Sequence, residues 1–131
     1  MLRKVLNGKI HRASVTHCDL DYVGSITIDA DLLRATGIRP NEAVLIANCD
    51  NGNRFETYVF EGEPGSGVIG VNGAAARLVE PGHKLIICAF AQVDADELDR
   101  HEARVAIVDD HNRITQQLTY PSHLSAVELT A

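Results

Sequence analysis

Residues 43–60 read AVLIANCDNGNRFETYVF, two apolar runs joined by the polar segment Asp50-Asn-Gly-Asn53. An Asn-Gly pair between such runs is the strongest short-range signal for a β-hairpin, because both residues tolerate the positive φ of a tight turn. We therefore expect two antiparallel strands, over 43–48 and 54–60.

On both sides of this hairpin the chain repeats the pattern of short apolar runs separated by turn residues. Further strands are expected over residues 10–16, 25–28, 68–71, 84–93 and 103–108. Many short strands with turn signals between them are typical of a closed barrel, so the sequence predicts a mainly β fold with small helices.

The helices are expected to be few and short. Asp29 has the character of an N-cap for a helix through Thr36, and Gly37 is suited to close it in the left-handed conformation. Residues 74–77 and 94–100 are each expected to form a short helical stretch. Beyond Gln117 the pattern is weak, and the tail is predicted to be loosely held.

Composition limits the classes of function. At 131 residues, 45% of them hydrophobic, the chain is long enough to bury one core as a single domain. The formal net charge of −6 argues against nucleic acid or an anionic membrane as the main partner. Residues 1–24 carry four Lys or Arg against two acids, so this leading segment is basic and suits an acidic substrate.

Cys18, Cys49 and Cys88 form an odd set without a C-x-x-C pair or a preceding signal peptide. This pattern indicates reduced thiols in a cytoplasmic protein, and Cys88 is expected to be a buried structural thiol. No apolar run approaches the roughly 20 residues of a membrane helix. His11, His17 and Cys18 lie at no standard zinc spacing, so no metal is expected.

Gly24-Ser25, within Asp21-Tyr-Val-Gly-Ser-Ile-Thr-Ile-Asp29, is by itself only a turn signal. Three further segments give it meaning, namely Lys9-Ile-His-Arg12, Asn51-Gly-Asn-Arg-Phe-Glu-Thr-Tyr58 and Val71-Asn-Gly-Ala-Ala-Ala76. Together, over residues 1 to about 90, they resemble the pyruvoyl-dependent aspartate 1-decarboxylases. The spacing between the four segments matches throughout.

The resemblance implies that the chain cuts itself between Gly24 and Ser25. The products would be a short chain, 1–24, and a chain 25–131 whose first residue, derived from Ser25, is a pyruvoyl group. That group would form a Schiff base with L-aspartate and accept electrons while CO2 leaves, giving β-alanine for pantothenate and coenzyme A synthesis. No pyridoxal phosphate is then needed, and the sequence offers no persuasive phosphate cradle for it.

The resemblance also implies an architecture, a double-psi β-barrel assembled as a homotetramer with active sites between subunits. Whether maturation is spontaneous or needs a partner protein stays open. Two departures from the family, Ala47 and the segment His101-Glu-Ala103, bear on how tightly the pocket closes and on whether other amino acids are accepted.

Roles for individual residues follow from the same resemblance. Gly24, Ser25 and Thr57 would carry the self-cleavage, Thr57 by stabilising the oxyanion. Tyr58 would return a proton to the substrate. The substrate-binding set would be Lys9, Arg54, Thr57, Asn72, Gly73, Ala74 and Ala75.

Two points stay open within this scheme. Thr57 and Tyr58 are adjacent, so a regular strand directs them to opposite faces, and the strand must end or twist there, or the site must wrap its edge. Which substrate carboxylate meets Arg54 and which meets Lys9 is also undecided. Rival functions are a pyruvoyl decarboxylase for a related amino acid and a non-catalytic barrel module that never matures.

Overall fold

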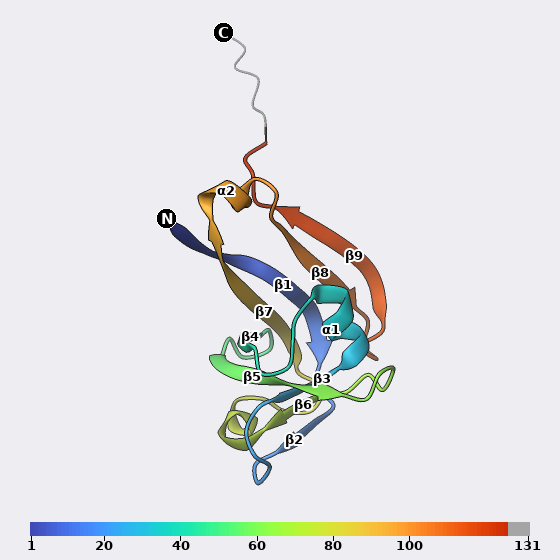
Figure 1. Cartoon of the computed structure of the whole chain (residues 1–131). Coiled ribbons are helices and arrows are strands. Elements are labelled where there is room, and N and C mark those ends of the chain that lie inside the picture. The colour runs from blue at the N-terminus through green and yellow to red at the C-terminus, as the bar shows by residue number, and fades with distance from the viewer. Residues whose placement is uncertain (126–131) are drawn as a thin grey trace.

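The structure, a computed structural model of the chain, describes residues 1–125 and consists mainly of β-strands (Figure 1). The nine strands are β1 Leu2–Ser14, β2 His17–Asp19, β3 Ile26–Asp29, β4 Ala43–Asn48, β5 Arg54–Gly62, β6 Ile69–Asn72, β7 Lys84–Asp94, β8 Glu102–Val108 and β9 Ile114–Pro121. The helical elements are α1 Ala30–Thr36, the 3-10 helix η1 Gly73–Leu78 and α2 Ala95–Leu98. The prediction of a mainly β fold with small helices is confirmed.

All nine strands belong to one sheet, in the order β2-β6-β3-β5-β4-β7-β1-β8-β9. Three neighbouring pairs are parallel, β1 with β8, β2 with β6 and β3 with β5, and the other pairs are antiparallel. Parallel pairs cannot be joined by hairpins, so the chain crosses between strands that are distant in sequence. This crossed arrangement is consistent with the mainly β double-psi barrel that the resemblance implied. Among the described residues β2 and β9 are the two edges of the sheet and do not pair with each other, so the expectation of a closed barrel is wrong for this chain.

The hairpin predicted at Asp50–Asn53 is confirmed as the turn between β4 and β5. Its register pairs Val44 with Thr57 and Ala47 with Arg54. Alternation along the strands directs one set of side chains into the core, where Ile46 and Ile87 are completely buried. The opposite set forms an outer face of β1, β7, β4 and β5, which carries several of the predicted site residues.

Helix α1 begins and ends as predicted. The Asp29 side chain accepts a hydrogen bond from the Asp31 N–H at 2.8 Å, and Gly37 closes the helix with φ 77°. The short helices at Gly73–Leu78 and Ala95–Leu98 also occur where helical stretches were expected, although α2 is shorter than the predicted 94–100.

Three strands differ from the prediction. Strand β1 begins at Leu2 rather than at residue 10, because its polar first half pairs with the far end of β7. Strand β2 was not predicted, since three mostly polar residues carry no apolar period. Strand β9 continues to Pro121, so the loose tail predicted beyond Gln117 is wrong for 118–121, which β8 holds by backbone pairing. Residues 126–131 of that tail lie outside the described residues.

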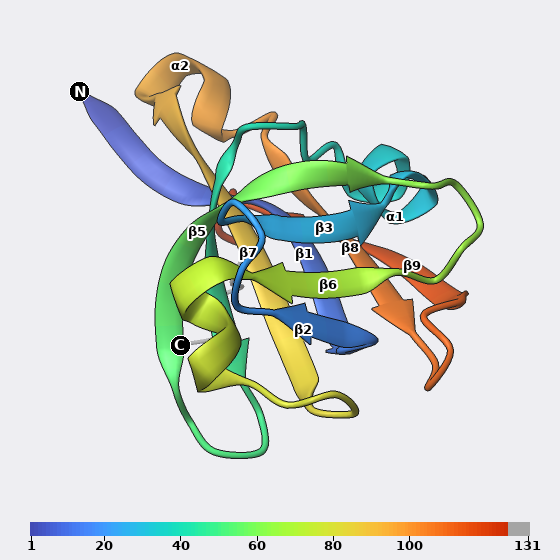
Figure 2. The same ribbon diagram turned by 90° about the horizontal axis from the view of Figure 1, so that it is seen from below.

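The arrangement of β3 matters most for the site. Figure 2 shows β3 between β5 and β6, with β2 beyond β6 and the η1 helix close by. Strand β3 begins at Ile26, which pairs with Val59 on one side and Val71 on the other. Gly24 and Ser25 therefore lead into a strand that is hydrogen-bonded on both edges.

Candidate active site

The Gly24–Ser25 peptide enters the barrel at the start of β3. Ser25 is buried, with 2% of its surface exposed, whereas Val23, two residues earlier, is 81% exposed. The backbone of Ser25 adopts φ 96°, a conformation that favours glycine and is strained for a serine. The chain thus passes from solvent into the core across the predicted cleavage bond, with the strain located at the serine.

Asn72 contacts Ser25 through both its backbone and its side chain. Its backbone N–H donates to the Ser25 carbonyl at 3.0 Å. Its side-chain amide donates to the Ser25 hydroxyl oxygen at 3.4 Å and to the Thr27 hydroxyl oxygen at 3.2 Å. Because the Ser25 oxygen accepts in this contact, its own proton is left available for transfer elsewhere. Asn72 itself is only 3% exposed.

Gly73 and Tyr58 both lie close to Gly24. Gly73 has φ +68°, and a β-carbon there would lie 3.0 Å from the Gly24 Cα, so only glycine fits this close approach. A β-carbon on Gly24 would lie 3.4 Å from the Tyr58 hydroxyl oxygen. The structure therefore brings Gly24, Ser25, Tyr58, Asn72 and Gly73 together around one peptide bond.

Thr57 and Tyr58 do face opposite sides of β5, which continues through both residues. Tyr58 is 40% exposed on the outer face, while Thr57 is half-buried opposite Val44. In the described part of the chain, β5 pairs with β4 alone up to Tyr58, and β3 joins only at Val59. The second edge of β5 is thus free of strand partners beside Thr57 and Tyr58, so a site can wrap around it.

Lys9 lies apart from this group within one chain. It pairs with Cys88 of β7, Cys88 pairs with Leu45 of β4, and Leu45 pairs with Glu56 of β5. Three strand spacings separate Lys9 from β5, which is about 14 Å along the sheet. The Lys9 ammonium group lies 5.6 Å from the centre of the Tyr120 ring.

Arg54, Ala74 and Ala75 occupy the borders of the site. Arg54 is exposed at the start of β5, opposite the half-buried Ala47 on the same outer face as Tyr58. Ala74 is exposed and Ala75 half-buried in the first turn of η1, directly after Gly73. The structure thus places Ala74 and Ala75 next to Gly73, whereas Arg54 lies four residues, about 13 Å, along β5 from Tyr58, and Lys9 lies three strand spacings from β5.

Two titratable groups near Lys9 have shifted pKa values. Burial, and then the neighbouring charges of Lys9 and Arg12, lower the pKa of His11. The Nδ1 atom of His11 is buried and has no hydrogen-bond partner among residues 1–125. Burial raises the pKa of the Cys88 thiol, and Lys9 opposes that shift. Cys88 is half-buried on the outer face, so the prediction of a fully buried structural thiol is wrong. It takes an outward position because β7 alternates there, with Ile87 and Ala89 directed into the core.

No metal site accompanies these residues. Within residues 1–125, no three His, Cys, Asp or Glu side chains lie close enough together to hold a metal ion. No helix in the same residues has the length and apolar character needed to span a membrane.

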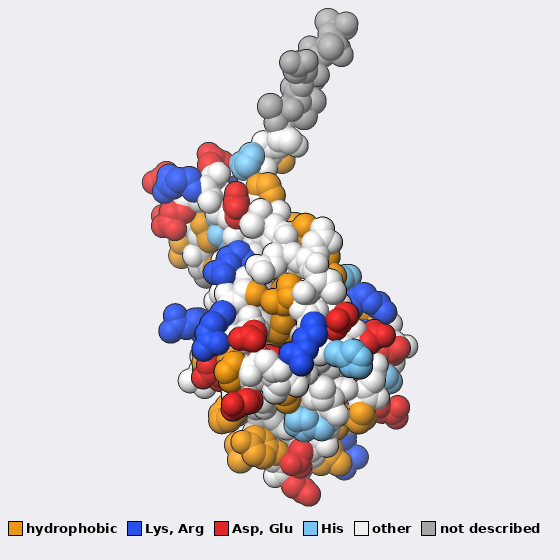
Figure 3. All heavy atoms as spheres, turned by 90° about the vertical axis from the view of Figure 1, so that its right-hand side faces the viewer, with side chains coloured by type: hydrophobic (Ala, Val, Ile, Leu, Met, Phe, Trp, Pro, Cys, Tyr) orange, Lys and Arg blue, Asp and Glu red, His pale blue; other side chains and the backbone are white. Residues whose placement is uncertain are grey.

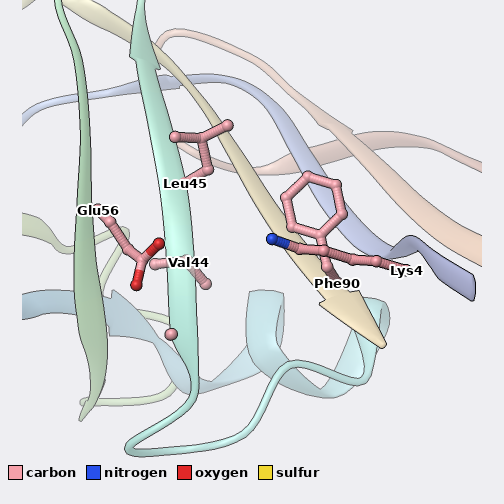
Figure 4. A pocket seen from close by; sticks show the side chains of 6 residues that line it. Lys4, Val44, Leu45, Glu56 and Phe90 are labelled. Carbon is pink, nitrogen blue, oxygen red and sulfur yellow. The ribbon is translucent and has the colours of Figure 1, made fainter. Parts of the chain in front are cut away.

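A cavity of about 430 Å³ opens on the outer face beside the site (Figure 4). Its lining includes Lys4, Val44, Leu45, Glu56 and Phe90. The Lys4 ammonium group lies 5.1 Å from the centre of the Phe90 ring, so the cavity wall combines a cation with an aromatic face. Its lining includes none of the predicted site residues, although its residue Ala43 pairs directly with Tyr58.

The residue-by-residue expectations omitted three side chains that the structure places at the site. Thr27 shares the Asn72 amide with Ser25. Tyr22, two residues before Gly24, forms an aromatic pair with Phe60 of β5. Period-two alternation from Tyr58 could have identified Phe60 as a residue of the same face, and the sequence places Tyr22 two residues before Gly24 and Thr27 two residues after Ser25, a local signal for both.

Comparison with known proteins identifies the family. Residues 1–115 match the model of the aspartate decarboxylase family. An aspartate 1-decarboxylase of Neisseria meningitidis is 54% identical over 124 residues, covering 94% of this chain and 98% of that protein. An aspartate 1-decarboxylase of Bacillus subtilis is 52% identical, covering 90% and 93%, and one of Caldicellulosiruptor bescii is 50% identical, covering 97% and 99%. The chain therefore belongs to the aspartate decarboxylase family of carboxy-lyases, as the resemblance of its four segments implied.

Proposed function

We propose that this protein is a self-processing decarboxylase that converts L-aspartate to β-alanine and CO2. The observation that carries the proposal is the environment of one bond. Ser25 is buried and strained, its hydroxyl oxygen meets the Asn72 amide, and its neighbour Gly24 lies between Gly73 and Tyr58. A structural turn needs neither a strained, buried serine nor a tyrosine hydroxyl against its backbone.

The self-cleavage begins with the Ser25 hydroxyl. Its oxygen attacks the Gly24 carbonyl carbon, the carbon–nitrogen bond breaks, and the hydroxyl proton passes to the leaving nitrogen, which gives an ester and a free amine. Loss of the Ser25 α-proton then breaks the bond between the Ser25 β-carbon and the ester oxygen. Gly24 leaves as a carboxylate, and residue 25 becomes a dehydroalanine. Addition of water and loss of ammonia leave a ketone at the new terminus of the chain 25–131.

The chain's residues suit these steps. Glycine at position 24 presents an unhindered carbonyl to the attacking oxygen. The oxyanion formed at that carbonyl needs a hydrogen-bond donor, and we assign this role to Thr57. Strands β3 and β5 are parallel and Ile26 pairs with Val59, so Thr57 and Gly24 each lie two residues before a paired position. The Asn72 amide fixes the Ser25 oxygen, and its backbone N–H fixes the Ser25 carbonyl.

The pyruvoyl ketone would supply the electron sink for decarboxylation, without pyridoxal phosphate or a metal. Tyr58, with its hydroxyl beside Gly24, is suited to donate the proton that replaces CO2. Arg54 can form a bidentate contact with one substrate carboxylate, and Lys9 offers a second cation. The substrate would be bordered by small side chains and backbone N–H groups, those of Asn72, Gly73, Ala74 and Ala75.

The distance of Lys9 from β5 supports an assembly in which a second copy completes each site. Within one chain about 14 Å of sheet separates Lys9 from β5, whereas a neighbouring copy packed on the outer face brings its own Lys9 closer. Half-buried Leu45, Ile86 and Phe90 give this face apolar area for such packing. We propose a cytoplasmic homotetramer that supplies β-alanine for pantothenate and coenzyme A synthesis.

Replacement of Ser25 tests the proposal directly. Ser25→Ala removes the attacking oxygen, so we expect one uncut chain of 131 residues and no β-alanine from labelled aspartate. The matched control, Ser125→Ala at an exposed serine, should give fragments 1–24 and 25–131 at the unmodified rate. Denaturing gels and intact mass measure the cleavage, and release of labelled CO2 measures the activity.

Each alternative predicts a different outcome. A cut Ser25→Ala chain contradicts the role of the hydroxyl. An unmodified protein that stays whole after prolonged incubation favours an inert barrel module, or one that needs a maturation factor. Processed protein that decarboxylates glutamate or another acid faster than aspartate identifies a related substrate instead.

A further inference from the structure

The segment Leu20–Val23, between β2 and β3, carries the chain to the cleavage bond over an exposed surface. Leu20, Tyr22 and Val23 are 51%, 46% and 81% exposed. Figure 3 shows hydrophobic side chains at the surface near the lower end of the molecule, the end at which β2 lies in Figure 1. A segment this exposed fluctuates unless specific contacts hold it, and self-cleavage requires the Gly24 carbonyl to stay beside the Ser25 oxygen.

One aromatic pair joins this segment to the barrel. The Tyr22 and Phe60 rings meet edge to face, with centroids 6.4 Å apart and an angle of 77° between their planes. This is a favourable arrangement, because the positive edge of one ring contacts the negative face of the other. Phe60 lies on β5 opposite Thr27 of β3, so it belongs to the rigid part of the sheet.

The pair acts on the same short stretch that Gly73 holds from the other side. A β-carbon on Gly73 would lie 3.5 Å from the Tyr22 carbonyl oxygen and 3.2 Å from the Gly24 nitrogen. Residues 22–24 therefore rest on η1 through their backbone and on β5 through the Tyr22 ring. Release of the ring leaves one of these two supports.

We propose that Phe60 is a positioning residue for self-cleavage, acting through Tyr22 to keep the Gly24 carbonyl in reach of Ser25. The inference rests on the proposed function. Phe60 touches neither reacting atom, so its effect is on the population of the reactive geometry. Loss of one edge-to-face pair should lower the cleavage rate about 2- to 10-fold.

The Tyr22–Phe60 contact should have little effect on decarboxylation once the Gly24–Ser25 bond is cut. The fragment 1–24 then ends at Gly24, and the residues assigned to turnover, apart from residue 25 itself and Lys9 of β1, belong to β5, β6 and η1. We therefore expect fully processed Phe60→Leu protein to decarboxylate aspartate within about twofold of the unmodified rate. A general loss of structure would instead lower both rates.

Pulse–chase labelling in cell-free synthesis measures the cleavage rate, because it follows each chain from its completion. Leucine labels both fragments, since Leu occurs in residues 1–24 and in 25–131. We expect Phe60→Leu and Tyr22→Leu each to slow cleavage, and the double variant to be no slower than either one, as for two residues that act through one contact. Phe60→Tyr keeps a ring and should cleave normally.

Tyr120→Leu is the matched control, because Tyr120 is an aromatic residue about as exposed as Phe60 and lies on β9, away from the cleavage bond. It should cleave at the unmodified rate, and thermal unfolding of all variants reports any loss of fold. Unmodified cleavage in Phe60→Leu, or independent effects of the Tyr22 and Phe60 substitutions, would overturn the inference while leaving the proposed function intact. An unmodified chain that never cleaves would overturn both.

Discussion

At the scale of single residues, the site depends on two adjacent residues whose side chains lie on opposite faces of one strand. Thr57 and Tyr58 are neighbours, yet one contributes to the interior side of β5 and the other to its outer face. Since β3 joins β5 only at Val59, both remain accessible from the edge near Gly24. Adjacent residues can thus take separate steps, oxyanion binding for Thr57 and proton donation for Tyr58.

Tyr58→Phe tests this division of roles. The substitution keeps the ring against Gly24 and removes the hydroxyl, so self-cleavage should proceed. Turnover should fall about 10²- to 10⁴-fold, the usual contribution of a general acid. Tyr120→Phe, at the other end of the sheet, is the control, and β-alanine formation by fully processed protein is the measurement. Ordinary turnover in Tyr58→Phe would remove Tyr58 as the acid.

At the scale of elements, Asp29 joins α1 to the loop before β6. It is 2% exposed, and its carboxylate accepts from the backbone N–H groups of Asp31, Gly65 and Gly67 at 2.8, 3.0 and 2.8 Å. One side chain therefore caps the helix and fixes the loop. The end of β3, the strand that Ser25 precedes, is held in place by the same contacts.

Asp29→Ala should destabilise the protein by about 2–3 kcal/mol, because it removes a helix cap and leaves buried backbone donors without partners. Asp31→Ala, at an exposed carboxylate of the same helix, should cost less than about 0.5 kcal/mol. Urea unfolding at one fixed protein concentration compares the two variants. Equal losses in the two variants would show that the buried hydrogen bonds of Asp29 contribute nothing to the free energy of unfolding.

At the scale of the whole molecule, Asn112 joins segments nearly a hundred residues apart. Its side-chain oxygen accepts from the Ser14 N–H at 2.7 Å, and its amide donates to the carbonyls of Ser14 and Gly67 at 2.9 and 2.8 Å. It is 2% exposed and has φ 60°, a conformation that Asn tolerates better than most residues. The end of β1, the loop before β6 and the β8–β9 turn thus meet at one amide.

Asn112→Ala should therefore lower the free energy of unfolding by about 3 kcal/mol, through unpaired backbone groups and an unfavourable φ. Gln117→Ala, at an exposed amide on β9, should change it by less than about 0.5 kcal/mol. Urea unfolding again gives the comparison. A small effect of Asn112→Ala would mean that water replaces its three hydrogen bonds without cost.

The sequence alone was sufficient where the signals are local. The Asn-Gly turn, the Asp29 cap, the Gly37 end and the apolar alternation of β4 and β7 are each decided by residues a few positions apart, and all are found in the structure. The start of the strand Leu2–Ser14 was placed wrongly and the strand Ile114–Pro121 was not predicted, because pairing with other strands holds these segments rather than their own side chains.

The sequence by itself determined the mainly β class, and its four spaced segments determined the family. The tertiary structure alone decided that Gly73 and Tyr58 approach Gly24, that Phe60 meets the Tyr22 ring, and that Lys9 lies three strand spacings from β5. The physical reason is the crossed, partly parallel order of the sheet. Strands distant in sequence become neighbours there, and no local propensity encodes which ones meet.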